Sequence, residues 1–444
     1  MPQRTLFRLA FKSDLLRRVV HRRVVDHAAK MLAPERQQFS SDKKEIDALF
    51  AAKPVAIAAK PIALYVHIPF CASACRYCIF KKTLNVSRME QYIKCVLKEI
   101  EIVANQGSIS GRPVTAMHIG GGTPSLLDAR QIDALLTRIE SRFGFKKNAQ
   151  ITLEGNPDSL TPKKVAEYCS AGVNRISMGV QSLNDDVLHQ MGRNHTGDDA
   201  RTAISALLTG GLENLSVDLM YGFKGQSTET FINDVQYLMD AKVAHISAFP
   251  LIRKSIRLQS PAHRKQEISN RRKMYQALVA VTQNTSYQQY SSEDFATTPD
   301  SKNKYQMAAW QFPKQDVVTL GAGSLGSLGG VYYSNCSDVD AYMKKTSEST
   351  LPVARIAPVS KAEEMRRSVL LGAKYIHIKS QDFFDVWGVD PQKALRPLLS
   401  RFEKAGIWTI DDTGVHVTHD GLQIITDIWS ELILSNLADA AQHN

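Results

Sequence analysis

Tyr65-Val66-His67-Ile68-Pro69-Phe70-Cys71-Ala72-Ser73-Ala74-Cys75-Arg76-Tyr77-Cys78 is the stretch that decides the fold. An apolar, β-prone run at Ile62–Ile68 leads directly into three cysteines spaced C-x3-C-x2-C, which predicts a strand that delivers three thiolates onto one loop. Structural zinc sites take four ligands, usually as two separated pairs, whereas the other three cysteines of this chain are scattered singly. Three thiolates on a four-iron cluster leave one iron open for a ligand. We favour this interpretation over three buried cysteines that serve only to pack the core.

Composition places the chain among ordinary globular proteins. Its 444 residues are 43% hydrophobic and 22% charged, which suits two or three folded domains rather than a disordered chain. No run of 18 apolar residues occurs, so no transmembrane helix is expected. Six unevenly spaced cysteines do not form a disulfide framework, and cluster thiolates need a reducing compartment. We therefore expect a cytoplasmic location.

The net charge of +11 is concentrated in a basic N-terminal arm, residues 1–60. In residues 1–23, seven Lys or Arg side chains accompany a single acid, Asp14, with leucines and valines interleaved. This composition resembles a transit peptide, and it also suits an arm that docks an acidic electron carrier. A solvated amphipathic helix is the third interpretation, and the sequence leaves all three open.

A strand–helix rhythm follows the arm. Because parallel strands alternate with helices in α/β folds, six such units predict a partial or full barrel with its chemistry at the carboxyl ends of the strands. The expected strands are residues 62–68, 114–119, 150–153, 175–180, 215–220 and 245–249, and the expected helices between them are residues 89–104, 129–143, 162–169, 198–208 and 229–239.

Each expected strand ends in residues suited to a ligand. The second strand ends in Gly120-Gly121-Gly122-Thr123, whose backbone allows close approach and whose amides suit an anion or a carboxylate. Glu154 after the third strand suits ribose hydroxyls. Gln181 ends the fourth strand, Arg193 follows shortly after, and Asp218 interrupts the apolar fifth strand. Each of these is a weak signal alone, but their shared position predicts one site.

Together these motifs resemble the radical S-adenosylmethionine (SAM) enzymes. More narrowly, they resemble the branch built around oxygen-independent coproporphyrinogen III dehydrogenase, which also contains haem chaperones and anaerobic haem-degrading methyltransferases. The resemblance covers about residues 60–330, and the C-terminal domain more weakly; it implies an α/β fold, a partial (β/α)6 barrel followed by a winged-helix-like domain. The motifs that carry it are residues 67–71 (HIPFC), 118–124 (HIGGGTP), 178–182 (MGVQS) and 218–222 (DLMYG).

The resemblance also implies roles for individual residues. Cys71, Cys75 and Cys78 would hold a [4Fe–4S] cluster, the catalytic centre, whose open iron takes the amino and carboxylate groups of SAM. Tyr77 and Thr123 fall where relatives contact a second SAM molecule, so two are expected. The residues that fall where the family binds SAM are Tyr65, Gly121, Gly122, Glu154, Gln181, Arg193, Asp218 and Ile252.

Three members of the branch compete as the nearest relative. The dehydrogenases carry a fourth cysteine two residues after the third, where this chain has Phe80. The chaperones have almost nothing before the first strand and carry a His-Asn-x-x-Tyr-Trp haem motif. The nearest stretch here, residues 302–310, begins with Lys302 and has no histidine. The haem-degrading methyltransferases share the length, the basic N-terminal region and a Phe at position 80. We favour them, and keep the chaperone and the dehydrogenase as alternatives.

The favoured reading implies specific chemistry. Haem and two SAM molecules would react without oxygen, a methyl group would reach the porphyrin, and the macrocycle would open to a linear tetrapyrrole (anaerobilin) with release of iron. A flavodoxin-type electron donor and haem-uptake proteins are the expected partners. Haem contacts stay unassigned: His195, His245 and Tyr305 are candidates by chemistry alone, and a structural or surface role is the simpler expectation for each.

We expect four regions: residues 1–60, the arm; 61–255, the barrel core; 256–355, a connecting region that completes the active site; and 356–444, a winged-helix-like domain. Relatives place a glycine-rich loop like residues 321–327 close to the active site. The expected helix of residues 391–405 carries the ordinary cations of a solvated face, so nucleic-acid binding is not expected. The remaining elements expected in the last region are helices at 362–371, 380–387 and 421–437 and a hairpin at 407–410 and 415–418.

Overall fold

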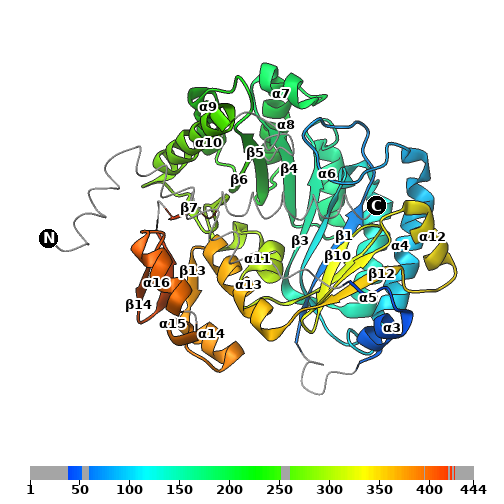
Figure 1. The fold of residues 1–444 in the computed structure, drawn as a ribbon. Helices are drawn as coiled ribbons and strands as arrows, with labels where there is room; N and C mark the ends of the chain where they lie inside the picture. The colour runs from blue at the N-terminus through cyan, green and yellow to red at the C-terminus, as the bar shows by residue number, and fades with distance from the viewer. Residues whose placement is uncertain are drawn as a thin grey trace.

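The computed structural model describes residues 39–52, 60–251, 261–394, 396–418, 421, 422 and 425. Within these ranges a mixed twelve-stranded sheet runs in the order β12-β11-β10-β9-β1-β2-β3-β4-β5-β6-β8-β7 (Figure 1). Strands β1 to β6 pair in parallel in chain order, and β9 adds a further parallel strand beside β1. The bounds of these strands are β1 Ile62–Ile68, β2 Val114–Gly121, β3 Phe145–Gly155, β4 Arg175–Gln181, β5 Leu215–Tyr221, β6 His245–Pro250 and β9 Asp316–Leu320.

The predicted α/β fold and its six strand–helix units are confirmed. The sheet order is open, with β12 and β7 at opposite edges, as a partial barrel requires. Each helix expected between the parallel strands forms within a residue or two of its predicted ends. The helices that connect the parallel strands are α4 Met89–Ala104, α5 Ala129–Phe143, α6 Pro162–Ser170, α7 Asp185–Met191, α8 Gly197–Thr209 and α9 Thr228–Asp240.

Helix α5 shows why local sequence was sufficient for these elements. Asp128 and Gln131 form a reciprocal capping box that satisfies amides at the start of the helix. Its buried side chains recur every three or four residues, so one face packs against the sheet. These buried side chains are Ile132, Leu135, Leu136, Ile139 and Phe143.

The sequence did not predict the elements that flank the parallel strands. Helix α10 (Pro261–Thr282) begins with a polar half, so its apolar period is visible only near its end. The added strands are short and pair antiparallel with their neighbours. The flanking strands are β7 Gln288–Gln289, β8 Asp294–Ala296, β10 Leu325–Leu328, β11 Val331–Asn335 and β12 Val353–Pro358; three further helices are α3 Lys43–Ala51, α11 Lys304–Trp310 and α12 Val339–Ser347. Single 3-10 turns occupy Val86–Arg88, Pro124–Leu126 and Pro299–Ser301.

A small C-terminal unit lies to one side of the sheet, beside α11 and α13 (Lys361–Lys374) (Figure 1). Its sheet order is β13-β15-β14, so the expected hairpin gains a third strand. The expected helix at 391–405 is represented by two described helices, α15 and α16, on either side of residue 395, which lies outside the described residues. These elements are β13 His377–Lys379, α14 Ser380–Trp387, α15 Pro391–Ala394, α16 Arg396–Lys404, β14 Trp408–Asp411 and β15 Gly414–Val417.

Other expectations fall outside the described residues. These include most of the basic arm (residues 1–38) and most of the expected last helix at 421–437. Among the described helices, none combines the length and apolar character that crossing a lipid bilayer requires.

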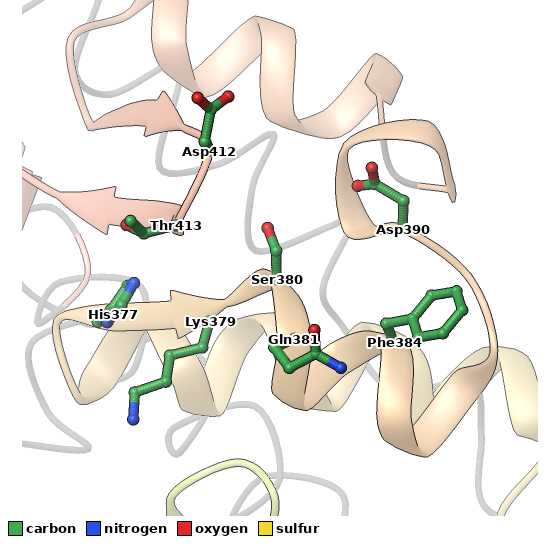
Figure 2. Close-up of a pocket in the computed structure, with 8 residues that line it drawn as sticks. All are labelled: His377, Lys379, Ser380, Gln381, Phe384, Asp390, Asp412 and Thr413. Carbon is green, nitrogen blue, oxygen red and sulfur yellow. The ribbon is translucent and has the colours of Figure 1, made fainter.

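A cavity of about 530 Å³ opens in the C-terminal unit, and no residue of the cysteine loop lines it (Figure 2). Its lining mixes cationic, anionic and neutral side chains, namely His377, Lys379, Ser380, Gln381, Phe384, Asp390, Asp412 and Thr413.

Candidate active site

The three clustered cysteines lie on the loop that leaves the carboxyl end of β1. The loop closes on itself, because the Thr83 amide donates to the Pro69 carbonyl at 2.8 Å and the Cys71 amide donates to the Thr83 carbonyl at 3.0 Å. Cys71 is buried, whereas Cys75 and Cys78 are partly exposed, and all three are free thiols. Burial raises the pKa of the Cys71 thiol, although a hydrogen bond with Thr123 opposes this effect.

The glycine triplet at the end of β2 passes directly against this loop. The Gly122 amide donates to the Ile68 carbonyl at 2.8 Å, and the Thr123 amide donates to the Phe70 carbonyl at 2.7 Å. A Cβ atom on Gly122 would lie 2.4 Å from the Phe70 carbonyl oxygen and 2.9 Å from Cys71 Sγ. Only glycine therefore allows β2 to approach the cysteine loop this closely.

Glu154, at the end of β3, links the triplet to the barrel interior. Its Oε1 lies 2.7 Å from His118 Nε2 on β2, and its Oε2 accepts from the Gly121 amide at 3.0 Å. Burial acts to raise the pKa of the Glu154 carboxyl, but His118 and the Gly121 amide outweigh burial, so the pKa lies below its ordinary value. Glu154 is thus held as a carboxylate, and it keeps lone pairs for a further donor.

These contacts correct the sequence-based rationale for the glycines. The amides were expected to serve as donors to a ligand carboxylate, yet those of Gly121, Gly122 and Thr123 all donate to groups of the chain itself. The triplet therefore provides close approach and positions Glu154. The acceptors of these three amides are the Glu154 carboxylate, the Ile68 carbonyl at the end of β1 and the Phe70 carbonyl of the cysteine loop.

A cluster of aromatic side chains packs around His118, the hydrogen-bond partner of Glu154. Tyr65 on β1 pairs in register with His118, and their rings stack at 5.9 Å between centroids. Tyr305 from α11 stacks on Tyr65 at 5.8 Å and also contacts His118 at 5.2 Å, so the three rings form one cluster. The Tyr65 hydroxyl lies 3.0 Å from Nδ1 of His67, and burial lowers the pKa of His67 to about 4, so this imidazole is neutral near pH 7.

The sequence-based site omitted His67 and His118, although the alternation of Tyr65 and His67 along one strand was a usable signal for a shared face. Tyr305 lies 240 residues from Tyr65 along the chain, and no local pattern could have placed it there.

Arg193 joins the cysteine loop to the end of β4. Its Nη1 donates to Cys75 Sγ at 3.4 Å, and its Nη2 donates to Asn156 Oδ1 at 2.8 Å and to the Gly179 carbonyl at 2.6 Å. Gln181 adopts a left-handed backbone conformation with φ of +73°, and its amide nitrogen would lie 2.9 Å from a Cβ on Gly179. Arg193 therefore contacts the cysteine loop directly, Gln181 lies beside Gly179, whose carbonyl Arg193 binds, and Asn156 is an addition.

Asp218 and Tyr77 are two further residues of the predicted site. Asp218 on β5 accepts from the Ser177 hydroxyl at 3.3 Å, and burial together with the nearby Glu154 charge raises the pKa of Asp218 to about 7. Tyr77 packs in an apolar cluster, with its ring edge-to-face against Phe223 at 6.1 Å. The proposed SAM contact at Ile252 lies outside the described residues.

A second buried network holds the glycine-rich turn after β9 against β1. The Tyr92 hydroxyl donates to the His67 carbonyl and accepts from the Ala322 amide, both at 2.8 Å. Glu99 on α4, fully buried, accepts from the Gly321 amide at 2.7 Å. It also accepts from the side chains of Asn335, at 2.6 Å, and Tyr342.

The histidines considered as haem contacts are internal. His195 Nε2 bonds to the Val180 carbonyl at 3.1 Å, and His245, fully buried, contacts the hydroxyls of Ser216 and Tyr290, both at 2.8 Å. Both rings thus have structural partners, which agrees with the simpler expectation.

Comparison of the sequence with known proteins identifies the family of this chain. The sequence matches the radical SAM superfamily over residues 65–238. It is 32% identical over 275 residues to "Heme chaperone HemW" from Haemophilus influenzae, a match that covers 60% of this chain and 70% of that protein. The chain belongs to the radical SAM family of the HemN/HemW type.

Two further relatives extend this radical SAM assignment along the chain. "Heme chaperone HemW" from Lactococcus lactis is 26% identical over 385 residues, which covers 85% of this chain and 99% of that protein. The solved structure of coproporphyrinogen III oxidase (HemN) from Escherichia coli superposes with a TM-score of 0.74 at 22% identity, over 91% of this chain and 96% of that one. This last likeness supports the fold.

A radical SAM protein uses a [4Fe–4S] cluster and SAM, and the residues present fit both. Three free thiols share one loop, a glycine cradle lies against Cys71, and Arg193 donates to the sulfur of Cys75. In the described part of the chain, no three His, Cys, Asp or Glu side chains converge on a single metal ion. A four-iron cluster instead takes its thiolates on different irons, which suits cysteines spread along a loop.

Proposed function

We propose that this radical SAM protein binds haem and uses a cluster on Cys71, Cys75 and Cys78 to cleave SAM beside it. One observation carries the proposal: the cysteine loop, the glycine triplet and Glu154 are joined by close contacts at the carboxyl ends of β1, β2 and β3. The bound cluster supplies the electron that splits the sulfonium, which is the step that the protein itself has no group to perform.

The chain's own residues would position the cosubstrate. Glu154, held ionised by His118 and Gly121, suits the ribose hydroxyls of SAM, and the absence of a side chain at Gly122 keeps β2 close against the loop that would hold the cluster. Arg193 would orient the cysteine loop through Cys75. Tyr77 in its apolar cluster and Thr123 beside Cys71 are the proposed contacts of a second SAM molecule.

We propose the regional boundaries 1–60, 61–255, 256–355 and 356–444 as functional units. The connecting region supports this division, because its β9 pairs with β1 and its Tyr305 stacks on Tyr65. It would thus complete the site that residues 61–255 begin.

The relatives favour haem delivery as the outcome of binding. Proteins named heme chaperones match over most of the chain, so a chaperone-type role is the candidate that the comparisons support better. In this role the protein would hold haem intact and pass it to an acceptor, and SAM cleavage would serve another purpose.

Two departures from the alternatives leave haem opening as a second candidate. Phe80 stands where the dehydrogenases carry a fourth cysteine, which counts against a dehydrogenase, and Lys302 stands where the chaperones carry the histidine of their haem motif, which counts against a chaperone. In the structure, Lys302 lies over the Tyr290 ring at 5.3 Å, and Asn303 caps α11. In this candidate function the protein would methylate haem with SAM and open the macrocycle to anaerobilin with release of iron, drawing electrons from a flavodoxin-type donor.

One anaerobic experiment separates the candidates. Reconstituted protein is incubated with haem, SAM and a chemical reductant, and then analysed by absorbance and mass spectrometry. Haem opening predicts loss of the Soret band, a linear tetrapyrrole and 5′-deoxyadenosine. Delivery predicts an intact Soret band and transfer of haem to an apo-haemoprotein. A protein that neither binds haem nor forms 5′-deoxyadenosine would refute both.

A further inference from the structure

An exposed apolar surface lies beside the cysteine loop. Phe80 is 64% exposed and Leu325, at the start of β10, is 68% exposed, with Leu84 and Val86 also exposed on the segment that follows the cysteines. Exposed aromatic and aliphatic side chains that gather in one place mark an interaction site, because water solvates such a surface poorly. We call this surface, together with Lys81 and Lys82, the apolar rim.

Hydrogen bonds tie the two halves of the rim together. Lys81 Nζ donates to the Ser337 hydroxyl at 3.3 Å. A Cβ on Gly323 would lie 3.6 Å from the Cα of Ser337, so Ser337 packs against the turn that precedes Leu325. Residues 323–325 also pair with residues 334–336. The Phe80–Val86 segment and the beginning of β10 are therefore neighbours although 245 positions separate Phe80 from Leu325.

The rim also reaches the proposed cluster. The Thr83 carbonyl accepts from the Cys71 amide, which folds the Phe80–Val86 segment back along the cysteine loop. A ligand on the rim would thus lie next to the site of SAM cleavage.

The rim is cationic as well as apolar. Among the described residues, no ion pair neutralises Lys81 or Lys82. A ligand that matches this surface has a flat apolar body and two carboxylates on one edge.

We propose that the apolar rim binds haem, with the macrocycle against Phe80 and Leu325 and the propionates paired with Lys81 and Lys82. This rests on the proposed function, since haem is the ligand in both candidates. It gives Phe80 a role: a ring at this position adds apolar contact for the macrocycle, which a cysteine would not provide.

The test is haem titration of the reconstituted full chain without oxygen, followed at the Soret band. Phe80→Ser should weaken haem binding about tenfold or more, because it removes a large apolar contact with the macrocycle. The double variant Lys81→Gln, Lys82→Gln should weaken haem binding about tenfold and leave binding of haem dimethyl ester unchanged, since the ester has no carboxylates to pair.

Matched controls lie elsewhere on the surface. Val386→Ser on α14 removes an exposed apolar side chain, and Lys147→Gln on β3 removes an exposed lysine. Both should bind haem as the wild type does. All variants should keep the iron content and SAM affinity of the wild type, which shows that the fold and the cluster loop survive.

The outcomes distinguish the two proposals. If the wild type binds no haem, the proposed function and the rim assignment both fail. Wild-type binding that the rim variants retain in full would overturn the rim alone. Variants that bind haem normally but accept electrons more slowly from a flavodoxin would also overturn it, and would assign the rim to a redox partner.

Discussion

Glu99→Gln is expected to change how the stability of this protein depends on pH. Glu99 is fully buried, and burial raises its pKa to about 7 from the ordinary value of 4.5, against hydrogen bonds from Tyr342, Gly321 and Asn335 that favour the carboxylate. The folded state therefore holds this proton more tightly than the unfolded chain does. Between pH 4.5 and 7 the unfolded chain binds fewer protons, so stability falls as pH rises.

The size of the effect follows from the shift. At about 1.4 kcal/mol for each pH unit, a rise from 4.5 to about 7 costs the wild type about 3 kcal/mol of stability across that interval. Glutamine cannot ionise and loses none of this. The side-chain NH2 group of the glutamine would, however, face the three groups that donate to Glu99 in the wild type. One hydrogen-bonding group left unsatisfied there costs about 1–3 kcal/mol at every pH. The variant should thus be clearly less stable than the wild type at pH 5 and nearly equal at pH 8.

Urea unfolding of anaerobic wild type and variant from pH 5 to 8 measures the difference. Parallel curves would refute the reasoning, because they would mean that Glu99 titrates alike in both states. A wild type that gains stability over the variant with rising pH would show that the three donors hold an anion. A second measurement tests whether Glu99 positions the turn at Gly321. The electron paramagnetic resonance spectrum of the reduced cluster with SAM should shift in the variant, because the Glu99 network holds this turn against β1.

Three further predictions concern the cysteine loop and its neighbours. Cys75→Ala should lose cluster absorbance and bound iron after reconstitution, whereas Cys169→Ala, at an exposed cysteine of α6, should retain both. Gly122→Ala should lower cluster content severalfold, since its methyl group would lie 2.4 Å from the carbonyl that precedes Cys71; iron and sulfide analysis of folded protein checks this, and normal content would contradict it. Arg193→Gln should make the cluster's reduction potential more negative, because a cationic donor to Cys75 Sγ is lost; an unchanged potential in anaerobic titration would remove Arg193 from this role.

Much of the parallel core was accessible from local sequence. Strand β1 and helices α4 and α5 have their predicted ends, because apolar periodicity and helix capping act over a few residues. The shared location of Cys71, Glu154 and Arg193 was also accessible, since parallel strands bring their carboxyl ends to one edge of the sheet. Short flanking strands such as β7 were not, because a strand of two residues has no periodicity to detect.

The sequence alone determined that three thiolates, a glycine triplet and a carboxylate meet at the ends of successive strands, because each signal sits next to the strand that carries it. The tertiary structure decided how these groups are used. It showed that the amides of Gly121 and Gly122 already have acceptors, that Tyr305 stacks on Tyr65, and that Lys81, just after the cysteines, bonds to Ser337 beside the turn that precedes β10. Such contacts join segments up to 256 residues apart, and they depend on packing of the whole chain.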